Sequence, residues 1–264
     1  MIGAFLAEWV ILRRRSLILS SFGPLLFFTF VGTVFAILGV DEPGGNRGPF
    51  GPTSGIEQLS SAGGLTLGLE SSSTFIGLII LSVFAVNLAR EYSNGTIRLL
   101  LVSEPRRARL LAGILLALGA FTAIAVVLAG ILSIALSFAM APGQGIPTGE
   151  WATSDGIFGA VATIGRTIAA TLVWGLIGAM IVMVTKSSAA AIATGAGGLL
   201  IFPTMLRQVA DGVTDRFPDA VLRAFLVGGN DALSGSTAAL MTAAYGVLCL
   251  ALLFTIFLRR DITD

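Results

Sequence analysis

The chain has 264 residues, of which 55% are hydrophobic and only 12% are charged, and its mean hydropathy is +0.92. A soluble globular domain usually carries about 25% charged residues, so the composition excludes an ordinary soluble protein and predicts an all-α integral membrane protein. The chain has no histidine, which excludes haem ligation by imidazole, His-containing zinc sites and Ser/His or Cys/His nucleophile pairs.

The N-terminal segment 1–15, MIGAFLAEWVILRRR, predicts a helix lying on the membrane surface. Its apolar residues recur at helical spacing around Glu8 and Trp9, and Arg13, Arg14 and Arg15 follow within reach of lipid phosphates. A cleaved signal is not expected, because the arginines come after the apolar stretch. A simple membrane anchor and a partner-binding helix both remain open.

Six uncharged apolar stretches are long enough to cross roughly 30 Å of hydrocarbon as helices. They cover residues 16–40, 72–89, 110–140, 167–185, 187–206 and 237–258. The pieces between them, of which 41–71 is the longest, are too short for a soluble domain, so we expect a single transmembrane domain over 1–264. Because none of these spans contains Asp, Glu, Lys or Arg, an ion-driven transport mechanism is not expected.

Orientation follows from the distribution of basic residues. With the N-terminus in the cytoplasm, 11 basic residues lie inside and five outside, as the positive-inside rule requires. Six spans then return the C-terminus to the cytoplasm. The excess of 15 arginines over one lysine suggests a GC-rich bacterial genome, so we expect the bacterial cytoplasmic membrane.

The spans contain few polar atoms. Phe27, Phe28, Asn87 and Thr194 are candidates for a substrate path, although lipid contact and helix packing are the simpler interpretations. Span 187–206 is rich in alanine and glycine and predicts a tightly packed central helix. Cys249 lies between two leucines, which is typical of a small buried hydrophobe.

The outer segments differ in composition. Residues 41–71 are rich in glycine and proline and predict a loosely ordered cap. Residues 207–236 predict two short amphipathic pieces, near 209–214 and 218–227, that form a re-entrant or interfacial element. The acids of this segment, Asp211, Asp215, Asp219 and Asp231, are spread along it beside arginines, so we expect a solvated charged face and no metal site.

The cytoplasmic segment 91–109 between the second and third spans is the most informative. Asn94 and Gly95 predict a turn, Thr96 is a plausible N-cap for a short helix over 97–102, and Glu104 and Pro105 restart a helix into span three. Such an element can pass a push from a cytoplasmic partner to both spans. A basic linker that only obeys the topology rule is the alternative.

This segment resembles the hallmark of the permease subunits of type-2 ABC exporters. Their second span ends in a glutamate, then a Gly-Thr pair, a Leu-Leu pair, a proline and basic residues. The matching residues here are Glu91, Gly95, Thr96, Leu99, Leu100 and Pro105, followed by arginines from Arg106. The surface helix, the six spans and the cytoplasmic termini fit the same permease fold, of the type V exporter kind. The start of the chain also resembles the bacterial branch of drug-efflux and peptide-antibiotic immunity transporters.

The resemblance implies a permease that dimerises, with identical or different copies, and binds a separate ATPase subunit that carries the ATP and magnesium. Site residues implied for coupling to that ATPase are Glu91, Tyr92, Gly95, Thr96, Ile97, Arg98, Leu99, Leu100, Glu104, Pro105, Arg106 and Arg107. The chain itself lacks a P-loop, because the positions one and six before its only lysine, Lys186, are Thr185 and Met180. We therefore expect no enzymatic activity, no bound cofactor or metal and no nucleic-acid partner in this chain. A membrane scaffold that moves no substrate is the alternative function.

Overall fold

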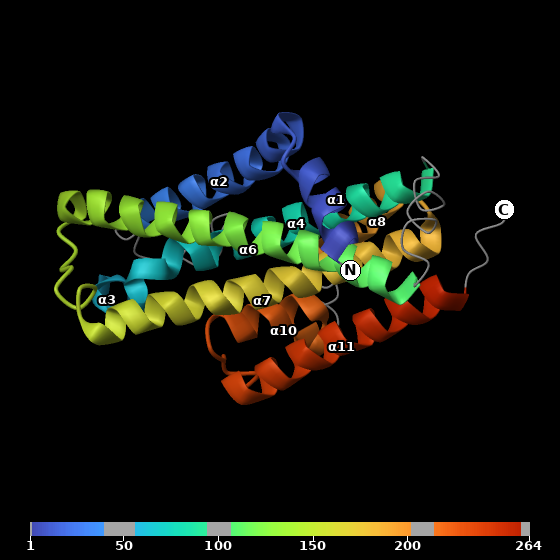
Figure 1. Cartoon of the computed structure of the whole chain (residues 1–264). Coiled ribbons are helices and arrows are strands. Elements are labelled where there is room, and N and C mark those ends of the chain that lie inside the picture. The colour runs from blue at the N-terminus through green and yellow to red at the C-terminus, as the bar shows by residue number, and fades with distance from the viewer. Residues whose placement is uncertain (1, 40–55, 94–106, 202–213, 260–264) are drawn as a thin grey trace. The chain divides into compact units, whose positions relative to one another are not determined.

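The computed structural model describes residues 2–39, 56–93, 107–201 and 214–259. Helices make up nearly all of these residues, and no β-strand occurs among them. The all-helical class predicted from composition is therefore confirmed for this part of the chain (Figure 1).

Within the described ranges, five helices are long and apolar enough to cross a membrane. They are α2 (Arg15–Leu38), α4 (Leu67–Ser93), α6 (Arg107–Met140), α7 (Ser154–Thr185) and α11 (Gly235–Arg259). Helices α4, α6, α7 and α11 each contain one predicted span and extend beyond it, whereas α2 covers most of the span 16–40 and ends at Leu38. The largest extension is in α7, which begins at Ser154, well before the predicted span 167–185, because its apolar pattern continues through Ile157, Phe158 and Val161.

Short helical elements connect the long ones. They are α1 (Ile2–Leu12), α3 (Ile56–Ser60), the 3₁₀ turns η2 (Ala62–Thr66), η3 (Ala141–Gln144) and η5 (Thr214–Arg216), α8 (Ser188–Ala193), the π-helical segment η4 (Thr194–Ile201), and α10 (Pro218–Leu226). Helix α10 coincides with one of the two predicted amphipathic pieces and packs along α11 (Figure 1). The other piece, at 209–214, lies almost entirely outside the described residues.

The predicted span 187–206 differs from a regular helix. Lys186 has a left-handed φ of 56° and ends α7, and Ser187 then caps α8 by accepting a hydrogen bond from the Ala190 amide at 3.2 Å. After α8 the chain continues as the π-helical segment η4. The small residues at 194–198 suit the predicted close packing, but they also allow the wider π turn, since little side chain opposes it. Residues 202–206 lie outside the described part of the chain.

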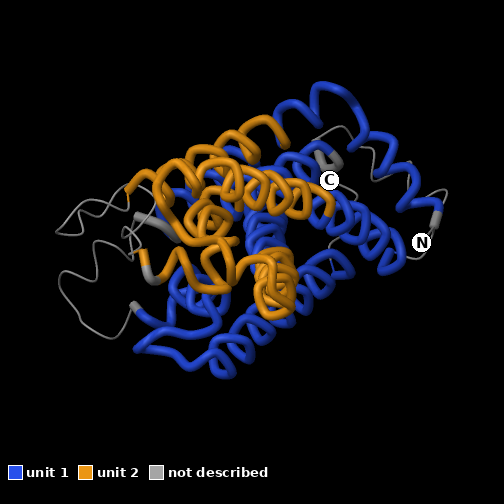
Figure 2. Tube along the Cα trace, turned by 90° about the vertical axis from the view of Figure 1, so that its left-hand side faces the viewer, with its two compact units in different colours: residues 1–21, 77–123, 170–264 blue, residues 22–76, 124–169 orange. Residues whose placement is uncertain are grey.

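The chain forms two compact units, and α2, α4, α6 and α7 each contribute residues to both (Figure 2). Unit 1 comprises residues 1–21, 77–123 and 170–264. Its core combines Leu81 of α4, Val173, Trp174 and Ile177 of α7, Leu222 and Leu226 of α10, and Cys249 of α11. The burial of Cys249 confirms its prediction as a small buried hydrophobe.

Unit 2 comprises residues 22–76 and 124–169. Its core, called here the Trp151 cluster, contains Ile37, Leu59, Leu65, Leu67, Ala141, Ile146, Trp151 and Ala160. The Trp151 indole donates a hydrogen bond from Nε1 to the Leu59 carbonyl at 2.9 Å, and its ring packs edge-to-face on Phe138 at 5.4 Å. The prediction of a loose cap is thus wrong for residues 56–71, which are helical and packed against residues far away in the sequence.

Candidate functional site

Two long helices flank the segment predicted to couple to an ATPase. Helix α4 continues through Glu91 and Tyr92 to Ser93, and α6 begins at Arg107. Nine further predicted coupling residues lie outside the described part of the chain: Gly95, Thr96, Ile97, Arg98, Leu99, Leu100, Glu104, Pro105 and Arg106. The short helix predicted at 97–102 falls in the same interval. Between the described parts of α4 and α6, residues 94–106 lie outside the part of the chain that the structure describes.

The N-terminal helix is shorter than predicted, because α1 ends at Leu12 and the chain turns before α2 begins at Arg15. Arg13, Arg14 and Arg15 are exposed at this corner. Trp9 stacks on Phe5 with ring centroids 5.8 Å apart, while Glu8 is buried with 3% of its surface exposed. The corner after α1 thus exposes its three arginines, whereas Glu8 within the helix is buried.

The four substrate-path candidates are divided between the units. In unit 2, Phe27 is exposed and Phe28 stacks on Phe75 with parallel rings 4.7 Å apart. In unit 1, buried Asn87 donates from Nδ2 to the Val83 carbonyl of its own helix at 2.8 Å, and Thr194 is exposed at the start of η4. The observed bond of Asn87 is the one that a packing residue makes.

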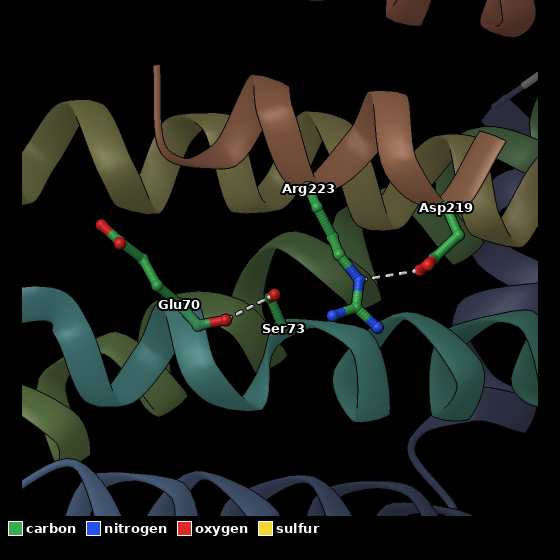
Figure 3. Close-up of polar contacts among 4 residues, drawn as sticks. All are labelled: Glu70, Ser73, Asp219 and Arg223. Atoms are coloured by element: carbon green, nitrogen blue, oxygen red, sulfur yellow. Dashed lines mark hydrogen bonds and ion pairs between the residues drawn. The ribbon is translucent and has the colours of Figure 1, made fainter. Parts of the chain in front are cut away.

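A charged group inside unit 2 was not predicted. Since α4 begins at Leu67, Glu70 falls in its first turn, and Arg166 falls within α7. The hydroxyl of Thr66 lies 3.5 Å from the Glu70 carboxylate, Thr163 also hydrogen-bonds this carboxylate, and Arg166 attracts it. Ser73 donates to the backbone carbonyl of Glu70 at 2.6 Å (Figure 3). Glu70 and Arg166 thus lie in the parts of α4 and α7 that extend beyond the predicted spans, and the spans themselves contain no charged residue.

The positions of these two charges along their helices are alike. Glu70 lies 20 residues before Arg90, and Arg166 lies 20 residues before Lys186. A separation of 20 residues corresponds to about 30 Å of straight helix. This is close to the hydrocarbon thickness of a bilayer. Leu67 of the Trp151 cluster precedes Glu70 on α4, and Ala160 of the same cluster precedes Arg166 on α7.

The acids of segment 207–236 are only in part a solvated face. Asp219 on α10 is buried, and its Oδ1 accepts a hydrogen bond from Nε of Arg223, one turn later, at 3.1 Å (Figure 3). Asp231 is exposed, and Asp211 lies outside the described residues. Within the described ranges, no three His, Cys, Asp or Glu side chains lie close enough to hold a metal ion.

The sequence contains signals for both charge contacts, although neither contact was predicted from it. Asp219 and Arg223 are four positions apart on an amphipathic helix, the spacing at which opposite charges meet on one face. Glu70 is a single acid within an otherwise apolar run from Leu65 to Ala89. The predicted span begins at Ser72, after this acid, and therefore does not include it.

One family model matches the chain, over residues 55–263, and its description is a protein of unknown function (DUF2705). The match covers the four long helices α4, α6, α7 and α11, together with the predicted coupling segment. No curated protein matches the chain.

Proposed function

The chain belongs to the DUF2705 family, whose function is unknown, and we propose that it is the membrane-spanning permease subunit of a type-2 ABC exporter. In this proposal a separate ATPase subunit binds the segment 91–109 on the cytoplasmic side. ATP-driven movement of that subunit pushes the segment, and two copies of the permease open a path to the outside. The protein lies in a bacterial cytoplasmic membrane with both termini in the cytoplasm.

The observation that carries the proposal is the placement of the glutamate, Gly-Thr and Leu-Leu pattern. It begins at Glu91 in the last turn of α4 and ends before α6, so a force on the segment acts on two membrane-length helices. Helix packing would transmit such a force through the bundle, because packed interiors move as discrete bodies. Two further elements fit this reading: the short apolar helix α1 before the first span, and the amphipathic helix α10 before the last.

The proposed cargo is hydrophobic or amphipathic. In the described part of the chain, the stretches 71–89 of α4, 110–140 of α6 and 167–185 of α7 contain no charged residue. A path lined by such helices offers nothing to replace the hydration shell of a small ion. Transport of a small hydrophilic ion into sealed vesicles that contain the complex would contradict this part of the proposal.

The test begins with mild detergent extraction of the tagged full-length chain and identification of the proteins that co-purify. We expect a stoichiometric ATPase subunit whose hydrolysis is reduced or lost with Glu91→Ala and with Gly95→Pro. The matched control is Glu150→Ala, the same substitution in the exposed turn before α7, which should leave hydrolysis unchanged.

Two outcomes would contradict the permease proposal. One is the absence of any nucleotide-binding partner in the purified material, which would favour a scaffold that moves no substrate. The other is an ATPase partner whose binding and hydrolysis are indifferent to both substitutions in the segment while the variants fold normally.

A further inference from the structure

A small cavity lies beside α10, next to the start of α11. Its volume is about 140 Å³, and it is lined by Asp215, Ala220, Arg223, Asn230, Ala232 and Leu233. All of these residues belong to unit 1. The lining combines a carboxylate, a guanidinium and a carboxamide in one small space, in a part of the chain that the proposed transport mechanism does not use.

The loop that forms one wall is held in a fixed conformation. Gly228 and Gly229 have positive φ angles of 80° and 122°, and the Gly229 amide donates to the Ala224 carbonyl of α10 at 2.8 Å. The Asn230 Oδ1 accepts hydrogen bonds from the amides of Ala232 and Leu233 at 3.1 and 2.8 Å. These contacts use the carbonyl oxygen of the Asn230 amide and leave its Nδ2 hydrogens available as donors.

The charges are arranged by the ion pair on α10. Asp219 has 8% of its side chain exposed and binds Nε of Arg223, whose side chain is 53% exposed. This contact orients the guanidinium and leaves its two terminal amino groups as donors, the arrangement that binds a phosphate. Among the described residues the Asp215 carboxylate has no hydrogen-bond or ion-pair partner, so it remains an acceptor in the lining.

The cavity lies at the N-terminal end of α11, a helix long and apolar enough to cross a membrane. Leu233 comes just before Gly235, the first residue of α11, and α11 has 25 residues, or about 37 Å of helix. A helix of that length crosses the hydrocarbon with both ends near the headgroups. Helix α10 buries Val221, Leu222 and Leu226 within the protein, and Leu222 and Leu226 pack in the core of unit 1.

We propose that this cavity binds the headgroup of a phospholipid with a primary ammonium, the phosphoethanolamine group. Arg223 and Asn230 donate to the phosphate, and Asp215 accepts from the ammonium. An anion alone is disfavoured, because the carboxylates of Asp215 and Asp219 stand against a single guanidinium. A quaternary ammonium is disfavoured because it has no N–H to donate to Asp215 and is bulkier. The site is independent of the proposed transport function.

The test uses the full-length protein in detergent with an equimolar mixture of phosphatidylethanolamine, phosphatidylcholine and phosphatidylglycerol, and native mass spectrometry to count retained lipids. We expect preferential retention of phosphatidylethanolamine, weakened about tenfold by Asp215→Asn, which removes one charge-assisted hydrogen bond. Asp231→Asn is the matched control, since Asp231 is exposed and does not line the cavity. It should retain the lipid as the unmodified chain does.

Arg223→Lys provides a second variant. A lysine keeps the positive charge beside Asp219 but loses the forked donors, so we expect weaker retention with an unchanged melting temperature. Free O-phosphoethanolamine as a competitor separates the two sources of the headgroup. If free O-phosphoethanolamine displaces the lipid only at a large excess, the result supports a lipid ligand. If it binds as tightly as the lipid does, the result contradicts a lipid ligand. Equal retention of phosphatidylcholine, or no effect of Asp215→Asn, overturns the proposal.

Discussion

The two tryptophans at the centres of the two cores are buried in different ways. Trp151 in unit 2 has 1% of its surface exposed and needs a polar partner, the Leu59 carbonyl. Trp174 in unit 1 has 3% exposed and packs against Gly77, where an added methyl group would lie 2.6 Å from its ring. The first core depends on the hydrogen bond and the ring contact of its tryptophan, whereas the second depends on close fit against a glycine. Each core should therefore fail under a different kind of substitution.

The largest expected effect is the loss of Trp151. Trp151→Ala removes the centre of the Trp151 cluster and should lower the free energy of unfolding by about 3–5 kcal/mol. Trp151→Phe keeps most of the ring but leaves the Leu59 carbonyl without its donor, at a cost of about 1–3 kcal/mol. Denaturant unfolding in mixed micelles measures both values. Phe158→Ala, at a side chain that is 73% exposed on the same helix as Ala160 of the cluster, is the control and should change stability little.

An intermediate effect is expected from adding one methyl group in unit 1. A Cβ on Gly178 would lie 2.6 Å from the Leu81 carbonyl oxygen, so Gly178→Ala should destabilise the protein by about 1–3 kcal/mol through overpacking. Gly165 on the same helix has open space around it. Gly165→Ala should be neutral or stabilise by up to about 1 kcal/mol, because alanine favours helix. Equal melting temperatures for the two variants would show that close fit does not govern this core.

The smallest effect concerns the charges of Glu70 and Arg166, which both belong to unit 2. Glu70 and Arg166 are both partly exposed, so screening limits their attraction. A double-mutant cycle with Glu70→Gln and Arg166→Gln should give a coupling free energy of about 0.5–1 kcal/mol. A coupling near zero would mean that the Thr66 and Thr163 hydroxyls alone hold the carboxylate.

Much of the membrane fold follows from local sequence, because the bilayer requires long apolar helices whatever their tertiary contacts. The five long helices, the turn at Lys186, helix α10 and the burial of Cys249 are all predictable in this way. The ends of the helices are less predictable from local sequence. A single acid such as Glu70 is compatible both with the end of a span and with a helix that continues past it.

The helical structure and packing of residues 56–71 could not be predicted from local sequence. They depend on the contact between Leu59 and Trp151, which are 92 residues apart, and a glycine-rich segment gives no sign of such a partner. Gly195 in η4 likewise packs closely against Leu81 of α4, a contact that the local sequence does not reveal. Of the candidate site, the flanking helices and the exposed arginines of the N-terminal corner were predictable, whereas the cavity beside α10 arises from a loop whose shape depends on two glycines.

The burial of Cys249 has a practical consequence. It is the only cysteine in the chain, and it lies in the core of unit 1 with 4% of its surface exposed. The unmodified protein should therefore behave toward water-soluble maleimides as if it had no thiol. Single cysteines introduced at Arg14, Phe158 or Asp231 would then report, in intact cells, which of these positions faces each side of the membrane, with no prior removal of a native thiol.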